Sequence, residues 1–312
     1  MIESAAQTRP EAPAELHAGL TSVVIVAADS GDVLARCVEL ALASIAELEI
    51  IIVDNDTRDG SVARIAARYA QDARVGFVYN SANLGFGVGC NRGAARARGD
   101  ALLFLNPDCL IERDTIARLR AVLKADTRGG VVGATQVSAD GHVDPASRRR
   151  DPLLRRALMS VSGLARFASR WPAFAGVELP PSSAASDRVD AVSGALMLLS
   201  RAMFAQVGGF DEGYFLHCED LDLCRRVRDA GYDVVCVNEV RVLHAKGGSS
   251  RHRPVFVARH KHRGMWRWFR KFDPAARNPL LCGLVFAGIW TAFGVKVPLL
   301  LLRGALRARS AQ

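Results

Sequence analysis

The chain has few features that would hold it together covalently. Its 312 residues include only seven scattered cysteines, and no two of them form a Cys-x-x-Cys pair. This pattern favours reduced thiols in a cytoplasmic setting over a disulfide framework or a zinc site. Residues 1–20 lack a continuous apolar run, which argues against a secretory signal, and we expect them to form a loose tail.

Acidic residues are nearly absent from the last fifth of the chain. Residues 246–312 hold 14 Lys and Arg against one acid, Asp273, which gives this segment a charge of +13. The whole chain has a net charge of +9, so residues 1–245 carry −4. Aromatic and basic residues alternate at 266–272, ahead of an apolar stretch at 280–302. This pattern suits a helix lying on an anionic membrane surface. No nucleic-acid-binding motif accompanies the charge, so we do not expect a nucleic acid partner.

The apolar stretch is short for a membrane span. Residues 280–295 are 16 uncharged residues, and Lys296 and Pro298 follow them. A span needs about 20 apolar residues. We favour in-plane or re-entrant attachment, while a single span and a packed helical hairpin stay open.

Four short aliphatic runs are each followed by polar turn residues and a helical pattern. They are residues 22–26, 49–53, 75–79 and 101–105. This alternation predicts an α/β fold with a mostly parallel central sheet flanked by helices. Ligands bind beyond the carboxyl ends of such strands, so Asp54 and Asp108 should face one crevice. For either residue alone, helix capping is an alternative.

A glycine-rich segment lies between the third run and the next helical pattern. Gly85, Gly87 and Gly89 alternate there, which allows a ligand to approach the backbone closely. A dinucleotide-binding oxidoreductase needs its glycines after the first strand, where residues 27–31 read Ala-Ala-Asp-Ser-Gly. A nucleotidyltransferase would need a basic phosphate loop there, and residues 27–31 contain no Lys or Arg. We favour neither reaction.

In their order along residues 21–272, the motifs of this chain resemble the family 2 glycosyltransferases of the GT-A fold, especially the bacterial rhamnosyltransferase-like branch. The segments that carry the resemblance are Val-Asp-Asn at 53–55, Asn-Leu-Gly-Phe-Gly-Val-Gly-Cys-Asn at 83–91, Leu-Asn-Pro-Asp at 105–108, Val-Ser-Gly-Ala at 192–195, Gly-Gly-Phe-Asp-Glu at 208–212, residues 215–226 with Glu219-Asp220, and His244 with Lys-Gly-Gly-Ser at 246–249. The resemblance implies a GT-A catalytic domain at 21–250 and a basic, apolar helical extension at 251–312.

The resemblance also implies roles for individual residues. Asp220 is expected to be the base that takes the proton of the acceptor hydroxyl, with Glu219 beside it orienting acceptor groups. Asp108 and His244 are expected to hold Mg²⁺ or Mn²⁺, which neutralises the leaving diphosphate. The residues expected on the nucleotide-sugar side are Asp54, Asn55, Asp29, Asn83, Gly85, Asn106, Gly194 and Ala195. The alternative for the acids at 219–222 is a cluster that only complements the helix dipole.

The function implied is an inverting, metal-dependent transfer of rhamnose from dTDP-rhamnose onto a lipid-linked saccharide. It would belong to cell-surface polysaccharide synthesis, such as that of an O-antigen, at the cytoplasmic face of a bacterial inner membrane. Galactofuranose and UDP-hexosamine donors stay open. The family has a polar residue and a tyrosine where this chain has Ala27 and Ala28, so a non-catalytic nucleotide-sugar-binding scaffold is the second hypothesis.

Arginines 148–150 could engage an acceptor diphosphate or form a solvated loop.

Overall fold

A computed structural model describes residues 16–126, 128–180, 182–245 and 253–310, with backbone only from residue 303. Most of the expected tail and the Lys-Gly-Gly-Ser segment at 246–249 lie outside the described residues. The strands are β1 (His17–Ala27), β2 (Leu48–Asn55), β3 (Val75–Asn80), β4 (Gly99–Leu105), β5 (Cys109–Leu110), β6 (Gly129–Val137), β7 (Arg148–Arg149), β8 (Ser186–Arg188), β9 (Ala191–Val192), β10 (Leu196–Ser200) and β11 (Asp233–His244).

The helices lie between and beyond these strands. They are α1 (Val33–Leu42), α2 (Ser61–Arg68), α3 (Phe86–Arg96), α4 (Thr115–Ala125), α5 (Leu154–Val161), α6 (Arg201–Gln206), α7 (Glu219–Asp229), α8 (Pro254–Phe272) and α9 (Pro279–Ser310). Short 3-10 turns are η1 (Pro145–Ser147), η2 (Leu164–Phe167), η3 (Pro172–Phe174) and η4 (Pro274–Arg277). Each of the four predicted strands lies within one of β1 to β4, so that prediction is confirmed.

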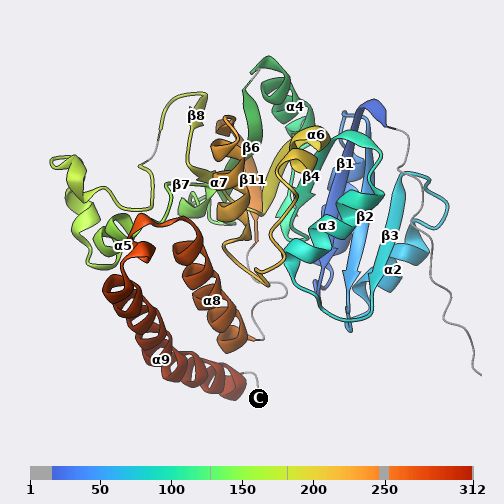
Figure 1. The fold of residues 1–312 in the computed structure, drawn as a ribbon. Coiled ribbons are helices and arrows are strands. Elements are labelled where there is room, and N and C mark those ends of the chain that lie inside the picture. Colours follow the sequence, from blue (N-terminus) through green and yellow to red (C-terminus); the bar gives the residue numbers. More distant parts are fainter. Residues whose placement is uncertain (1–15, 127, 181, 246–252, 311–312) are drawn as a thin grey trace, which may run out of the picture.

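A nine-stranded sheet forms the centre of the molecule (Figure 1). Its order is β3-β2-β1-β4-β10-β6-β11-β5, and β8 pairs with β11. The strands β3, β2, β1, β4, β6 and β11 run in one direction, while β10, β5 and β8 run against them. The predicted α/β fold is therefore confirmed, with antiparallel strands inserted into a mostly parallel sheet. A separate two-stranded ribbon joins β7 to β9.

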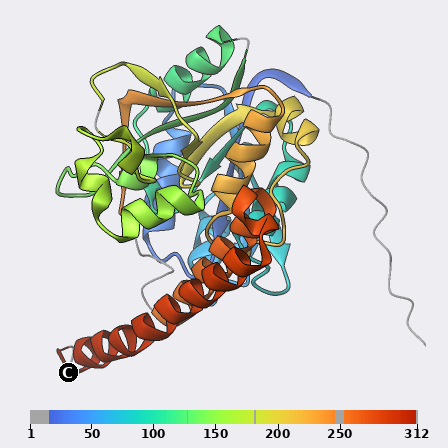
Figure 2. The same cartoon turned by 60° about the vertical axis from the view of Figure 1, so that its left-hand side comes forward.

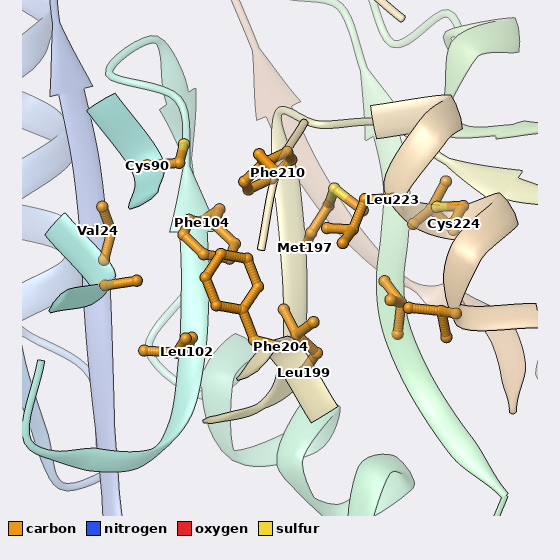
Figure 3. Close-up of a cluster of buried hydrophobic side chains, with 14 of the residues drawn as sticks. Val24, Cys90, Leu102, Phe104, Met197, Leu199, Phe204, Phe210, Leu223 and Cys224 are labelled. Atoms are coloured by element: carbon orange, nitrogen blue, oxygen red, sulfur yellow. The ribbon is translucent and has the colours of Figure 1, made fainter. Parts of the chain in front are cut away.

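Two apolar layers cover the faces of the sheet, because neighbouring residues of a strand point to opposite sides. Val24 of β1 belongs to the layer that includes buried residues of α3, α6 and α7, whereas Val23 belongs to the layer that includes those of α1, α2 and α4. Figure 3 shows the first layer, where the Phe104 ring lies 5.0 Å from Phe204 and 4.9 Å from Phe210 between ring centroids. Trp268 of α8 is buried in this same layer, so α8 contributes to the core that covers the sheet.

Helices α8 and α9 form a hairpin that carries the C-terminal apolar stretch. Trp266 of α8 and Phe286 of α9 lie 5.1 Å apart, and His262 and Phe293 lie 5.4 Å apart, between ring centroids. The range Pro279–Leu302 is long and apolar enough to cross a membrane, with a mean hydropathy of 1.9 and none of its most apolar window buried. This range exceeds the 16 uncharged residues because α9 continues through Lys296 and Pro298. Figure 2 shows α9 leaving the body of the molecule.

The glycines of α3 let this helix lie close against the sheet. A Cβ added at Gly89 would lie 2.7 Å from Val26 Cγ1, and one added at Gly93 would overlap Val24 Cγ1 and lie 3.0 Å from Val53 Cγ2. Such distances are shorter than van der Waals contact. Helix α3 can therefore lie this close to the sheet because Gly89 and Gly93 have no side chains.

Gly93→Ala tests this close packing. Alanine favours a helix over glycine by about 1 kcal/mol, but overpacking a core costs about 1–3 kcal/mol. We expect a net loss of about 1 kcal/mol in the free energy of unfolding, measured by urea denaturation, since the overlap outweighs the helix preference. Ala95→Gly on the exposed side of α3 is the control, because it changes helix preference alone. A Gly93→Ala protein at least as stable as the wild type would contradict the packing.

Candidate functional site

The side chains singled out by the sequence gather at one edge of the sheet. They lie at or just beyond the carboxyl ends of β1, β2, β3, β4 and β11, in the turn between β9 and β10, or at the start of α7. These five strands run in the same direction, so their carboxyl ends share that edge. Backbone and side-chain contacts connect these groups step by step.

The first group lies beyond β1 and β2. Asp54 Oδ1 accepts a hydrogen bond from the Thr57 amide at 2.8 Å, and Asp29 Oδ1 accepts one from the Arg58 amide at 2.7 Å. Thr57 Oγ1 donates to the Ala27 carbonyl at 3.3 Å. The N-cap of α2 is Gly60, so Asp54 closes a turn and does not cap the helix. Both carboxylates thus hold one loop in place, and their contact with a nucleotide stays a prediction.

Asn55 organises the glycine-rich loop from inside. Its side chain is 2% exposed, and its Nδ2 donates to Asn83 Oδ1 at 3.0 Å and to the Gly85 carbonyl at 3.3 Å. Its Oδ1 accepts from Asn80 Nδ2 and from the Leu84 amide, each at 3.0 Å. These bonds fill the hydrogen-bonding capacity of the Asn55 amide. Asn55 therefore shapes the loop that carries Asn83 and Gly85.

Gly85 connects this loop to the segment that leads into α7. Its φ is +92°, a region that favours glycine. A Cβ there would lie 2.6 Å from the Phe215 carbonyl oxygen, and the amide of Phe86 donates to that oxygen at 2.9 Å. A side chain at position 85 would separate the two segments.

Asp108 and His244 are brought together by strand pairing. His244 at the end of β11 pairs with Cys109 of β5, and the Ala245 amide donates to the Asp108 carbonyl at 2.9 Å. As a result His244 Nε2 lies 3.3 Å from Asp108 Oδ1, and both side chains are 13% exposed.

The Asp108–His244 pair suits a divalent cation. Gln136 Oε1 lies 3.1 Å from His244 Nδ1, and with Nδ1–H donating to it, the lone pair of Nε2 faces the Asp108 carboxylate. In that tautomer the two acceptors face each other, an arrangement that a proton or a bound cation between them would satisfy. Carboxylate oxygen and imidazole nitrogen both suit Mn²⁺. Among the described residues there is no group of three or more His, Cys, Asp or Glu that could hold a metal.

The turn between β9 and β10 joins this pair to α7. The Asn106 amide donates to the Ala195 carbonyl at 2.9 Å, and the Gly194 amide donates to Asp220 Oδ2 at 3.0 Å. A Cβ at Gly194 would lie 3.2 Å from Asp220 Cβ, so glycine is what allows the approach. Asn106, Gly194 and Ala195 thus line the path between Asp108 and Asp220.

Asp220 is buried, and both of its carboxylate oxygens accept hydrogen bonds. Its Oδ2 lies 2.6 Å from Arg149 Nη2, and its Oδ1 accepts from the Leu221 amide at 2.8 Å. Burial raises the pKa of the Asp220 carboxyl, but the Arg149 charge and the backbone amide of Gly194 outweigh it, so its pKa lies below the usual value. Asp220 is therefore ionised at neutral pH.

Arg149 is the functional residue whose role the sequence did not reveal. It lies 71 residues before Asp220 and reaches it because β7 pairs with β9, with Arg149 opposite Ala191. The expectation of a solvated loop is wrong for this arginine and for Arg148, which is 8% exposed and bound to Asp187 at 2.6 Å. The only signal was the run of three arginines.

Glu219 differs from its neighbour. His217 and Cys218 both have left-handed backbone, with φ of +67° and +73°, and this costly turn places Glu219 and Asp220 at the start of α7. The Oε2 of Glu219 is buried and has no hydrogen-bond partner. Burial and then the charge of Asp220 raise the pKa of Glu219 to about 8. Glu219 thus carries a proton at neutral pH.

Asp222, the third acid of this turn, has a structural role. Its carboxylate is fully buried and bound to Arg226 at 2.5 Å and to Lys271 of α8 at 2.7 Å. The alternative of a cluster that only complements the helix dipole describes Asp222 best. Asp220 is distinguished from it by its contact with the Gly194 amide.

Comparisons with known proteins identify the family of the chain. The family model described as Glycosyl transferase family 2 matches residues 22–176. The chain is 31% identical over 269 residues to the N-acetylglucosaminyl-diphospho-decaprenol L-rhamnosyltransferase of Mycobacterium tuberculosis (strain CDC 1551 / Oshkosh), covering 78% of this chain and 86% of that protein. It is 28% identical over 290 residues to the rhamnosyltransferase WbbL of Escherichia coli (strain K12), covering 87% and 98%.

A solved structure shows the same fold. The mannosyltransferase PcManGT from Pyrobaculum calidifontis, in complex with GDP-Man and Mn²⁺, aligns with a TM-score of 0.57 at 18% identity, covering 97% of this chain and 84% of that one. The expected GT-A architecture is confirmed by this similarity.

Glu219→Gln tests the protonated state of the buried carboxyl. Between the ordinary pKa of 4.5 and about 8, the folded chain keeps this proton and the unfolded chain loses it. The free energy of unfolding should therefore fall as pH rises through that window and level off above it. We expect Glu219→Gln to flatten this fall, as measured by urea denaturation across the window. The exposed Glu112→Gln is the control, and an unchanged slope in Glu219→Gln would overturn the assignment.

Proposed function

Because the chain belongs to glycosyl transferase family 2 and is a glycosyltransferase, we propose that it moves rhamnose from dTDP-rhamnose onto a lipid-linked saccharide with inversion at the anomeric carbon. The observation that carries the proposal is the contact path from Asp220 through Gly194, Ala195 and Asn106 toward the Asp108–His244 pair. It puts a buried carboxylate and a potential metal site at the same sheet edge. The names of both rhamnosyltransferase relatives support the sugar, and the name of the mycobacterial one supports the acceptor class.

Asp220 acts as the base in this mechanism. It takes the proton of the acceptor hydroxyl while that oxygen bonds to the anomeric carbon of the donor. The bond from the anomeric carbon to the diphosphate oxygen breaks, and the diphosphate leaves with the electron pair. Arg149 keeps Asp220 ionised. Glu219 is protonated below a pKa of about 8 and can donate a hydrogen bond to the acceptor.

The donor would occupy the strand ends on either side of Asp108. When held by Asp108 and His244, Mg²⁺ or Mn²⁺ would neutralise charge on the diphosphate. Asp54 would accept from N3–H of the thymine ring, with Asp29 near the ribose. Asn55, through Asn83 and Gly85, would keep the loop beside the nucleotide in shape, a role supported by its four hydrogen bonds.

The acceptor class bears on where the protein works. One relative is named for a decaprenol-linked acceptor, and this chain carries an exposed apolar helix, α9. We therefore place the reaction at the cytoplasmic face of a bacterial inner membrane, with α9 attached peripherally or inserted shallowly. The product would enter a cell-surface polysaccharide such as the O-antigen of lipopolysaccharide.

Transfer from a panel of nucleotide sugars to a short-chain lipid-linked acceptor tests the function. We expect metal-dependent turnover with dTDP-rhamnose, and a loss of about 10²- to 10⁴-fold in kcat for Asp220→Asn, since the base is removed. Asp108→Ala should abolish the response to Mn²⁺. Asp229→Asn at the far end of α7 is the control. Turnover with another donor would correct the sugar, and binding without turnover of any donor would favour the scaffold.

Arg149→Gln tests the ion pair separately. Without the guanidinium the pKa of Asp220 rises toward or above its usual value, because burial then acts without compensation. A base must be unprotonated, so the acid limb of kcat/KM against pH should move to higher pH. Arg150→Gln is the control, since Arg150 bonds to the Gly176 and Glu178 carbonyls. A uniform fall in kcat/KM with an unmoved limb would show that Arg149 acts otherwise.

A further inference from the structure

One segment outside the sheet presents apolar side chains to solvent. This insert, residues 154–174, contains α5, η2 and η3, and no residue of these three elements is buried. Its exposed large apolar side chains, with their exposed fractions, are Leu158 (53%), Val161 (88%), Leu164 (36%), Phe167 (39%) and Trp171 (49%). Five such side chains within fourteen residues form a patch, in contrast to the single exposed apolar residues normal for a surface.

The charge of the insert has one sign. Residues 152–177 include four arginines and no Asp or Glu. The guanidinium of Arg166 lies 4.7 Å from the ring centroid of Phe167, and that of Arg170 lies 5.4 Å from the ring centroid of Trp171. Arg156 differs, since it binds Asp190 at 2.7 Å and fastens α5 to the body. Aromatic rings next to arginines, without acids, match the boundary between lipid headgroups and acyl chains.

The insert lies beside the turn that connects α8 to α9. The Leu154 amide donates to Asp273 Oδ2 at 2.5 Å, and Asp273 is the residue between α8 and η4. Leu153 and Phe272 both pack against the same core layer. Figures 1 and 2 both show the insert near the junction of α8 and α9. Two segments more than 100 residues apart in sequence therefore present apolar side chains at neighbouring places.

A shallow pocket of about 400 Å³ opens at this junction. Trp266, Arg270, Arg277 and Phe286 line it, with Cys282 at its wall. Arg270 and Arg277 are exposed, and the guanidinium of Arg270 lies 5.6 Å from the ring centroid of Trp266. Two cations beside aromatic rings suit an anionic phosphate headgroup whose chains lie in apolar surroundings.

We propose that the insert docks on an anionic phospholipid bilayer and forms a second membrane contact beside α9. This inference rests on the membrane placement in the proposed function and adds to it a surface within the catalytic body. Charge complementarity favours this occupant. A second copy of the chain would bring two acid-free arginine segments together, whereas an anionic leaflet attracts each of them. Contact at two places would also fix the orientation of the catalytic edge relative to the bilayer.

A reporter dye on the insert of the full-length protein tests the proposal. In a Cys282→Ser background, whose other cysteines are buried, an NBD dye is placed at the exposed Ser169→Cys. Vesicles of phosphatidylcholine with phosphatidylglycerol should shift its emission to the blue, and vesicles of phosphatidylcholine alone should shift it much less. The same dye at the exposed Ala67→Cys of α2 should not shift. A protein that sediments with vesicles while the Ser169 dye stays unshifted would overturn the proposal.

Two triple variants separate the contribution of the apolar side chains to vesicle binding from that of the arginines. Val161→Ser with Phe167→Ser and Trp171→Ser should abolish the blue shift with both vesicle types. Arg155→Gln with Arg166→Gln and Arg170→Gln should weaken binding to the anionic vesicles about tenfold or more, since each arginine near such a surface contributes roughly fivefold. A blue shift that appears without vesicles and grows with protein concentration would indicate a second copy and overturn the proposal. Transfer to a short-chain acceptor without vesicles reports on the proposed function independently.

Discussion

The ion pair between Arg149 and Asp220 is the interaction on which the architecture of the site depends. A buried carboxylate is costly unless a charge and hydrogen bonds compensate it. The compensation here needs a glycine at 194, so that a backbone amide can come within 3.0 Å, and a β7–β9 ribbon to bring the guanidinium in. The ribbon also fixes where the insert leaves the body, because α5 begins soon after β7. The segment after β6 thus supplies the arginine that compensates the buried Asp220 carboxylate.

A second constraint comes from α8. A Cβ at Gly264 would lie 2.6 Å from the His217 carbonyl oxygen, so this helix supports the left-handed turn directly. Arg267 and Lys271 bind Asp211 at 2.8 and 2.7 Å, and Lys271 also reaches Asp222. The pairing of Asp211 with α8 favours a loop-stabilising role for this acid. The helix α8, which leads to α9, therefore packs directly against the turn that presents Glu219 and Asp220.

The sequence predicts the parts of the site that regular structure places. Strands with a strong aliphatic pattern put Asp54 and Asp108 at one edge, and the order of the motifs along the chain, supported by resemblance to the family, paired Asp108 with His244. It does not predict Arg149 opposite Asp220, because a two-stranded ribbon between irregular segments leaves no periodic signal. The sequence also cannot separate residues that would touch a ligand from residues that hold a neighbouring loop in shape. Asn55 matches a nucleotide-binding motif, yet in the structure its amide is engaged by the loop that it shapes.

The two adjacent carboxyls of the turn differ because the guanidinium of Arg149 forms its ion pair with Asp220. Arg149 binds Asp220 and lowers its pKa, whereas Glu219 meets burial and the nearby negative charge, which raise its pKa to about 8. Two neighbouring acids with pKa values moved apart can act in different protonation states at the same pH. Near neutral pH one group can accept a proton and the other can donate a hydrogen bond. The same backbone turn thus supplies two chemical functions, and the single arginine decides which residue has which.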